Sequence, residues 1–268
     1  MVNCIAICGD SFATGMGIDI DPDIMYEKSF GSLVSKHIGV NYKNYARAGC
    51  CNFVINLQVQ KIIQQKKENL FSPFVLITTT HHSRFSFPLE NDIGIVSYDL
   101  ADVDYAIHNV FGSKEELTQR LPFTLNEKPR LTSDTVGNWL KYRKNKNEKL
   151  RRNFQNIENK LLSVESYFEH LYSDIIKRDY DLALICKMHI DLNNANLPHI
   201  IMSGEKHLGN YIGKENFLYN DWGYYSQKYP DGVGSGHCSY QGHIEVANRV
   251  LEKLNTNRLL YQLDDRHL

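Results

Sequence analysis

The chain has 268 residues, which is enough for one sizeable hydrophobic core or for a core with a small cap. Hydrophobic residues make up 42% and charged residues 23%, close to the average of globular domains, so the composition excludes a largely disordered chain. The formal net charge of -1 provides no field that would attract nucleic acid or an anionic membrane, and neither is an expected partner.

The first predicted element is a buried strand over residues 3–8. It is an apolar run rich in isoleucine that stops abruptly at Gly9, Asp10 and Ser11. Ser11 is therefore placed at the carboxyl end of a first strand, where open α/β sheets form their ligand crevices. A serine in such a crevice becomes a nucleophile when a base removes its proton.

The following elements alternate between helix and strand. Apolar spacings predict, in chain order, a helix over 29–37, a strand over 41–46, a helix over 52–67 and a strand over 74–79. Gly39 is expected to stop the first of these helices, and Asn52 to cap the second. The alternation predicts a parallel, doubly wound sheet.

The regular alternation ends at residue 84, and residues 84 to about 147 show mixed polarity and no long period. This stretch is too long for a simple connection, so we expect a mainly helical cap or subdomain inserted in a single domain of residues 1–268. A dense basic run from Lys141 to Arg152 is interpreted as the solvated start of a long helix rather than as a phosphate-binding surface.

The last part of the chain resumes the α/β pattern. The predicted elements are a helix over 148–178, then either a helix over 180–195 or a strand over 181–188, then a strand over 200–202 and a final helix over 241–254. Between the last two lies a tyrosine-rich segment, residues 217–230, which is expected to be a loop or short strand.

The chain resembles the SGNH, or GDSL-like, hydrolase superfamily, because three of the four sequence motifs of that superfamily have a counterpart here in the same order and spacing. The family has its nucleophile in an N-terminal Gly-Asp-Ser, as at residues 9–11, and its histidine near the C-terminus, as at His237. The glycine after its second strand matches Gly49. Its third motif, normally Gly-x-Asn-Asp, is replaced here by residues 78–81, which read Thr-Thr-Thr-His.

This resemblance implies a three-layer α/β/α fold of flavodoxin-like type and ester hydrolysis through an acyl-enzyme, without metal or cofactor. It assigns Ser11 as the nucleophile and His237 as the base. Gly234 occupies the position where the family has its acid, so Asp231 is the nearest candidate to orient the imidazole. A backbone carbonyl is the alternative, and the enzyme then works as a Ser–His dyad.

The resemblance also implies an oxyanion hole, which needs preorganised hydrogen-bond donors. The backbone N–H groups of Ser11 and Gly49 are two expected donors, and Thr80 replaces the family's asparagine as the third. His81 and Arg84 are predicted to bind substrate, with a surface arginine as the alternative for Arg84.

Small acyl groups on a carbohydrate are the expected substrate. Four aromatic side chains suit stacking on sugar faces or packing within the fold: Tyr219, Trp222, Tyr224 and Tyr225. One alternative is a binding or structural protein that has lost activity, consistent with the altered third motif. Another is a metal-dependent phosphoesterase, whose ligands would be Asp10, His81, His82, His237 and His243.

Six cysteines are present, and none has the C-x-x-C spacing of a zinc site. Cys4 and Cys8 are expected to be small core residues of the first strand. The sequence has no apolar run near 18 residues and no visible signal peptide, so we expect a cytoplasmic protein. The pattern predicts no oligomeric state.

Overall fold

A computed structural model describes most of the chain outside its middle. The described residues are 2–19, 21–48, 50–68, 71–82, 85–90, 94–98, 170–171, 173–232 and 236–256, with the backbone alone at 85–90, 94–98 and 174. The chain divides into two compact units. The first comprises Met1–Ala48, Asn52–Thr80 and Asp181–Leu268, and the second comprises Gly49–Cys51 and His81–Tyr180.

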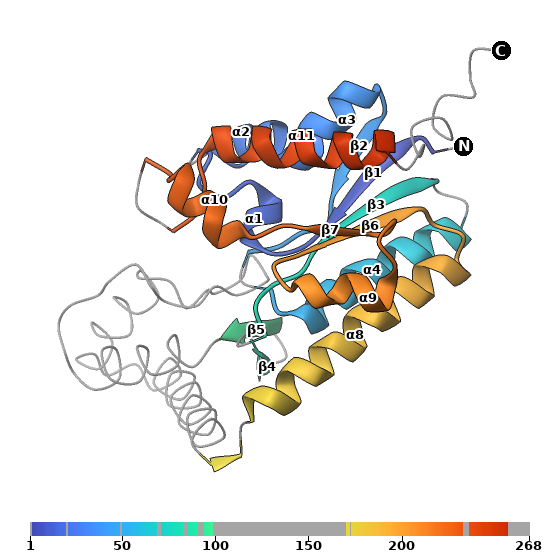
Figure 1. The fold of residues 1–268 in the computed structure, drawn as a ribbon, viewed down its shortest axis with the longest axis vertical. Helices are drawn as coiled ribbons and strands as arrows, with labels where there is room; N and C mark the ends of the chain where they lie inside the picture. The colour runs from blue at the N-terminus through green and yellow to red at the C-terminus, as the bar shows by residue number, and fades with distance from the viewer. Residues whose placement is uncertain are drawn as a thin grey trace, which may run out of the picture. The chain divides into compact units, whose positions relative to one another are not determined.

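A five-stranded parallel sheet forms the centre of the first unit (Figure 1). Its strands are β1 (Cys4–Cys8), β2 (Asn41–Asn44), β3 (Pro73–Thr78), β6 (His199–Ser203) and β7 (Phe217–Tyr219). They lie in the order β2-β1-β3-β6-β7, and every neighbouring pair is parallel. Counted within this unit the order is 2-1-3-4-5, that of flavodoxin-like folds. The predicted α/β class with a doubly wound sheet is confirmed.

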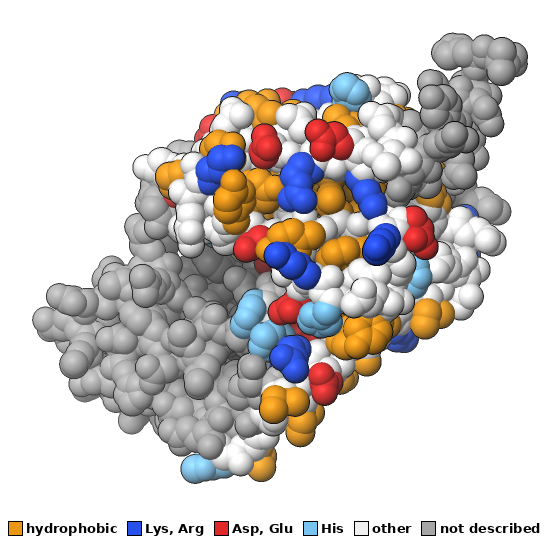
Figure 2. Space-filling view, in the orientation of Figure 1, with side chains coloured by type: hydrophobic (Ala, Val, Ile, Leu, Met, Phe, Trp, Pro, Cys, Tyr) orange, Lys and Arg blue, Asp and Glu red, His pale blue; other side chains and the backbone are white. Residues whose placement is uncertain are grey.

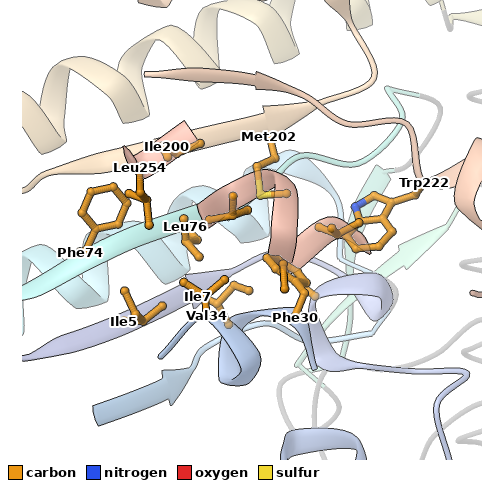
Figure 3. Close-up of a cluster of buried hydrophobic side chains, with 14 of the residues drawn as sticks. Ile5, Ile7, Phe30, Val34, Phe74, Leu76, Ile200, Met202, Trp222 and Leu254 are labelled. Carbon is orange, nitrogen blue, oxygen red and sulfur yellow. The ribbon is translucent and has the colours of Figure 1, made fainter. Parts of the chain in front are cut away.

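One face of the sheet is covered by α3 (Phe30–Ile38) and α11 (Tyr240–Thr256) (Figure 1). As predicted, α3 ends at Gly39, whose φ of 77° is left-handed. Figure 3 shows the core on this face, where side chains from three strands meet those of the helices. Its buried members include Ile5, Ile7, Phe30, Val34, Phe74, Leu76, Ile200, Met202, Trp222 and Leu254.

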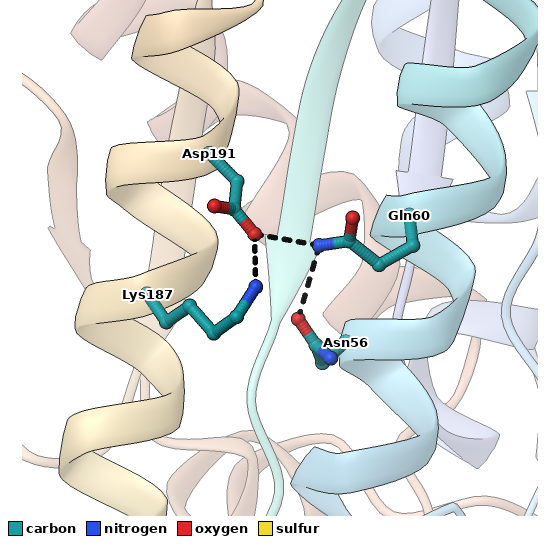
Figure 4. A network of polar contacts seen from close by, with 4 residues as sticks. All are labelled: Asn56, Gln60, Lys187 and Asp191. Carbon is teal, nitrogen blue, oxygen red and sulfur yellow. Dashed lines mark hydrogen bonds and ion pairs between the residues drawn. The ribbon is translucent and has the colours of Figure 1, made fainter.

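The other face carries α4 (Asn52–Lys67) and α8 (Asp174–Asn194) (Figure 1). Polar side chains join these two helices, as Figure 4 shows. Asp191 accepts a hydrogen bond from Gln60 Nε2 at 2.7 Å and pairs with Lys187, while Gln60 Nε2 also lies 3.4 Å from Asn56 Oδ1.

The expectation of two elements meeting near residue 179 was wrong, because α8 continues through that point. No glycine or proline occurs between residues 174 and 194 to stop the helix. The strand alternative that began at residue 181 is wrong for the same reason. The part of the predicted helix before residue 170 lies outside the described residues.

Short elements complete the described part of the first unit. They are α1 (Ser11–Thr14), α2 (Pro22–Lys28), the 3₁₀ helix η2 (Lys206–Leu208), α9 (Gly209–Ile212) and α10 (Trp222–Lys228). The tyrosine-rich segment thus contains a short strand, β7, followed by a helix that the sequence did not predict. Cys4 and Cys8 are buried in β1, as expected.

In the second unit, β4 (Phe85–Glu90) and β5 (Gly94–Tyr98) form an antiparallel hairpin. The rest of the predicted insertion at about 84–147 lies outside the described residues, so its extent and its helical character stay predictions. Within the described ranges, no helix is long and apolar enough to cross a membrane. Figure 2 shows acidic and basic side chains interspersed over the visible described face, which fits the balanced charge.

Two buried histidines are held neutral in the first unit. His199 Nδ1–H donates to the carbonyl of Leu197 at 2.9 Å, so His199 Nε2 is the acceptor for His189 Nδ1, also at 2.9 Å. Burial is the main reason that the pKa of His199 is lowered to about 4. Burial, with a smaller contribution from the charge of His237, lowers the pKa of His243 to about 3.

The lowered pKa values of His199 and His243 predict that the protein loses stability in mild acid. Their folded-state pKa values lie below the ordinary value of 6.5, so their contribution is complete above that pH and is lost as the pH falls toward 4. The titration of each histidine is expected to lower the free energy of unfolding by about 3 kcal/mol by about pH 4. Urea unfolding at several pH values measures this, and His199→Gln should flatten the dependence. The exposed His207→Gln serves as control, and equal slopes in both variants would contradict the explanation.

Candidate active site

Ser11 is the first residue of α1, separated from the end of β1 by Gly9 and Asp10, and is 4% exposed. Asp10 caps this helix, because its Oδ1 accepts a hydrogen bond from the N–H of Phe12 at 3.1 Å. Gln58 binds both backbone groups of Gly9, with distances of 2.8 Å to N and 3.2 Å to O. A Cβ at Gly9 would lie 2.1 Å from Thr78 Oγ1, so only glycine fits there. The bend that presents Ser11 is therefore held from several sides.

His237 reaches Ser11 from the other end of the chain. Its Nε2 lies 2.8 Å from Ser11 Oγ, a distance at which the serine hydroxyl donates to a neutral imidazole. The ring is half-buried, in the loop that precedes α11. A hydrogen bond between a nucleophile and its base is the arrangement that general-base catalysis requires.

The loop carrying His237 is fixed by backbone hydrogen bonds. Asp231 N–H donates to the carbonyl of His237 at 3.1 Å, and Ser239 N–H donates to the carbonyl of Tyr229 at 2.7 Å. These bonds flank the antiparallel bridge between Pro230 and Cys238. His237 therefore lies on a short ladder rather than on an unsupported loop.

Gly17 lies against this loop with a φ of +94°, which disfavours any side chain. A Cβ there would lie 2.6 Å from His237 Cβ and 2.9 Å from the carbonyl oxygen of Cys238. Gly17 is thus a positioning residue for His237 that the sequence analysis missed. The only signal was a second glycine soon after Gly15.

Asp231, the predicted orienting acid, is 7% exposed, and its Cβ atom lies near that of His237. A Cβ built on Gly17 would lie 3.4 Å from Asp231 Cβ and 2.6 Å from His237 Cβ. The Cβ atoms of Asp231 and His237 therefore lie near the same point. The acid is therefore brought to the neighbourhood of the imidazole despite its unusual spacing. Its part in catalysis stays a prediction, as does the carbonyl alternative.

Thr80 follows β3 in a segment tied to α4. The Asn52 amide accepts from Thr80 N–H and donates to Thr80 O, both at 3.0 Å. The same amide donates to the buried carboxylate of Asp181 at 2.8 Å. Asn52, expected as a helix cap, thus fixes the backbone of the third motif. That the Thr80 hydroxyl serves the oxyanion hole stays a prediction.

For the remaining predicted site residues, the described structure gives no position relative to Ser11. Gly49 and Arg84 lie outside the described residues. His81 belongs to the second unit and is exposed, with its ring 4.1 Å from that of His82. Among the described side chains, no group of three or more His, Cys, Asp or Glu is arranged to hold a metal ion.

The aromatic residues before His237 divide into two kinds. Trp222 and Tyr225 are buried at 8% and 3% exposure and belong to the core, so they pack the fold instead of presenting faces to a sugar. Tyr224 is 51% exposed. His243 is buried, and its Nδ1 accepts from Phe30 N–H at 3.3 Å.

No protein-family model matches the chain, and no curated protein matches it. Three solved structures are similar at 11% identity. One is a carbohydrate esterase described as having divergent catalytic and non-catalytic binding functions, with TM-score 0.41 and coverage of 94% of this chain and 68% of that one.

Another is an acetyl xylan esterase from the rumen bacterium Butyrivibrio proteoclasticus, with TM-score 0.46 and coverage of 96% and 65%. The third is an active-site mutant of a family two carbohydrate esterase from Clostridium thermocellum, with TM-score 0.35 and coverage of 95% and 63%. The chain thus spans about two thirds of the length of these structures.

Proposed function

We propose that the protein is a serine ester hydrolase of SGNH type that acts through an acyl-enzyme. The observation that carries the proposal is the 2.8 Å contact between Ser11 Oγ and His237 Nε2 at the carboxyl end of β1. A serine is a weak nucleophile until a base accepts its proton, and at this distance His237 Nε2 can act as that base. In support of the proposal, doubly wound folds bind their ligands at the carboxyl ends of the strands, the end of β1 at which Ser11 lies.

The proposed reaction has two steps that share one base. Ser11 Oγ attacks the ester carbonyl carbon while His237 Nε2 takes the hydroxyl proton, and the alcohol leaves with that proton. Water then attacks the acyl-enzyme while His237 takes a proton from this water. The carboxylic acid leaves, and the serine hydroxyl is restored by the proton that His237 returns.

Charge on the carbonyl oxygen needs donors in both steps. We assign these donors to the backbone N–H groups of Ser11 and Gly49 and to the hydroxyl of Thr80. His81 and Arg84 are the proposed substrate contacts, and Asp231 the orienting acid. Loss of a single oxyanion donor typically lowers turnover by about 10²–10³-fold. The fall in turnover in Thr80→Val therefore measures how much the Thr80 hydroxyl contributes to the oxyanion hole.

The proposed substrates are small acyl groups carried by a carbohydrate or a similar alcohol. Tyr224 supports this choice, because the residue is 51% exposed and a tyrosine ring can stack on a sugar. Acetylated xylan and p-nitrophenyl acetate separate the two parts of the proposal. Release of acetate from both supports a carbohydrate esterase, and release from the nitrophenyl ester alone keeps the esterase but removes the carbohydrate.

Ser226→Ala is a suitable control for these assays. The Ser226 hydroxyl donates to the carbonyl of Trp222 within α10 at 3.0 Å and takes no part in the proposed chemistry. Its loss should leave hydrolysis unchanged. If folded protein cleaves neither ester, the hydrolase proposal fails, and a binding protein on the same fold becomes the better hypothesis.

A further inference from the structure

A stack of three rings reaches the proposed base. The Phe12 ring lies between Trp222 and His237, with centroid distances of 5.0 Å to the indole and 4.8 Å to the imidazole. The indole is nearly parallel to it at 14°, and the imidazole is tilted by 48°. Since Phe12 directly follows Ser11, the nucleophile and the ring that touches its base belong to adjacent residues.

The far side of this stack is anchored in the core. Trp222 is 8% exposed, and its ring packs against Phe30 at 5.6 Å, His243 at 5.7 Å and Tyr225 at 6.1 Å. Figure 3 shows Trp222 and Phe30 among the buried side chains of this cluster. A tightly packed indole leaves Phe12 little room to move away from the imidazole.

An imidazole hydrogen-bonded to a serine still has freedom that catalysis must remove. The ring can turn about its χ2 angle, and the neutral form exists as two tautomers. Only the tautomer with its proton on Nδ1 leaves Nε2 of His237 free to accept from Ser11. A ring packed against the imidazole, as Phe12 is, restricts the turning and so favours the productive arrangement.

We propose that Phe12, backed by Trp222, is a positioning residue that holds the His237 imidazole in the orientation in which Nε2 accepts the Ser11 proton. This inference rests on the proposed function of the same pair. The phenyl ring of Phe12 has no group that donates or accepts a proton, so Phe12 acts through His237. Small misplacements of catalytic groups cost up to about 10²-fold in rate, which sets the scale of the effect.

Phe12→Leu tests the proposal, with Phe30→Leu as the matched control. Both changes remove a ring that packs against Trp222, but among the described ring contacts only that of Phe12 reaches His237. Phe30 is fully buried, so its loss should destabilise the fold at least as much. Phe12→Tyr keeps the ring and serves as the conservative variant.

The first readout needs no activity. Nitrogen-15 NMR of the His237 side chain reports which ring nitrogen carries the proton. We expect one tautomer in the unchanged protein, in Phe12→Tyr and in Phe30→Leu, and a mixture in Phe12→Leu. The second readout is the rate at which a fluorophosphonate labels Ser11, which should fall by about 10–100-fold in Phe12→Leu alone.

An unchanged tautomer in Phe12→Leu would overturn the proposal, and so would an equal disturbance in Phe30→Leu, which would mark a general effect of core packing. A changed tautomer in Phe12→Leu, in a protein whose Ser11 is never labelled, would support the positioning role while contradicting the esterase. The two failures are therefore distinguishable.

Discussion

His237→Ala is expected to lower the rate at which Ser11 reacts with a fluorophosphonate by about 10³-fold or more. The reason is the 2.8 Å contact between Ser11 Oγ and His237 Nε2, through which the proposed mechanism transfers the serine proton. Without it, the hydroxyl must lose its proton to water in a site where Ser11 is 4% exposed. Labelling rates measured by intact-protein mass spectrometry give the ratio directly.

Two further variants make this result specific. His207→Ala removes an exposed imidazole from η2 and should label at the unchanged rate. Ser11→Ala should abolish labelling, and adding His237→Ala to it should change nothing more, because the two side chains act as one unit. If His237→Ala labels as fast as the unchanged protein, His237 is not the base.

Gly17→Ala is expected to cost about 2–4 kcal/mol of stability and to disable the site together with the fold around it. The left-handed φ of +94° is one cause. The other is a clash, since the new methyl group would lie 2.6 Å from His237 Cβ and 2.9 Å from a backbone oxygen. Urea unfolding measures the stability, and fluorophosphonate labelling measures what remains of the serine's reactivity.

Gly39→Ala separates the two causes. Gly39 also has a left-handed φ, +77°, but a Cβ there would meet nothing within 4 Å. Its substitution should therefore cost only the backbone strain of about 1–2 kcal/mol and leave labelling intact. If Gly17→Ala behaves like Gly39→Ala in both measurements, Gly17 does not position His237.

Much of the fold follows from local patterns in the sequence. The buried strands appear as short apolar runs, and Gly39 marks the end of α3, because these signals depend on a few neighbouring residues. The helix α8 was harder to interpret. It meets α4 partly through polar groups such as Gln60 and Asp191, so its apolar spacing is weak and a break was wrongly expected.

The site was predictable only where a motif marks it. Ser11 and His237 stand in recognisable surroundings, and the structure brings them to hydrogen-bonding distance. No local sequence pattern indicates that Gly17 lies against His237, or that Phe12 stacks on Trp222. Such contacts join residues far apart in the chain and arise only when the sheet and its loops have folded.

The most direct test of the central claim is to treat the native protein with a fluorophosphonate probe and to locate the adduct by peptide mass spectrometry. We predict a single adduct on Ser11, which is lost when the protein is unfolded before treatment. Native protein that carries no adduct, or carries it on another serine, would contradict the assignment of Ser11 as a nucleophile activated by His237.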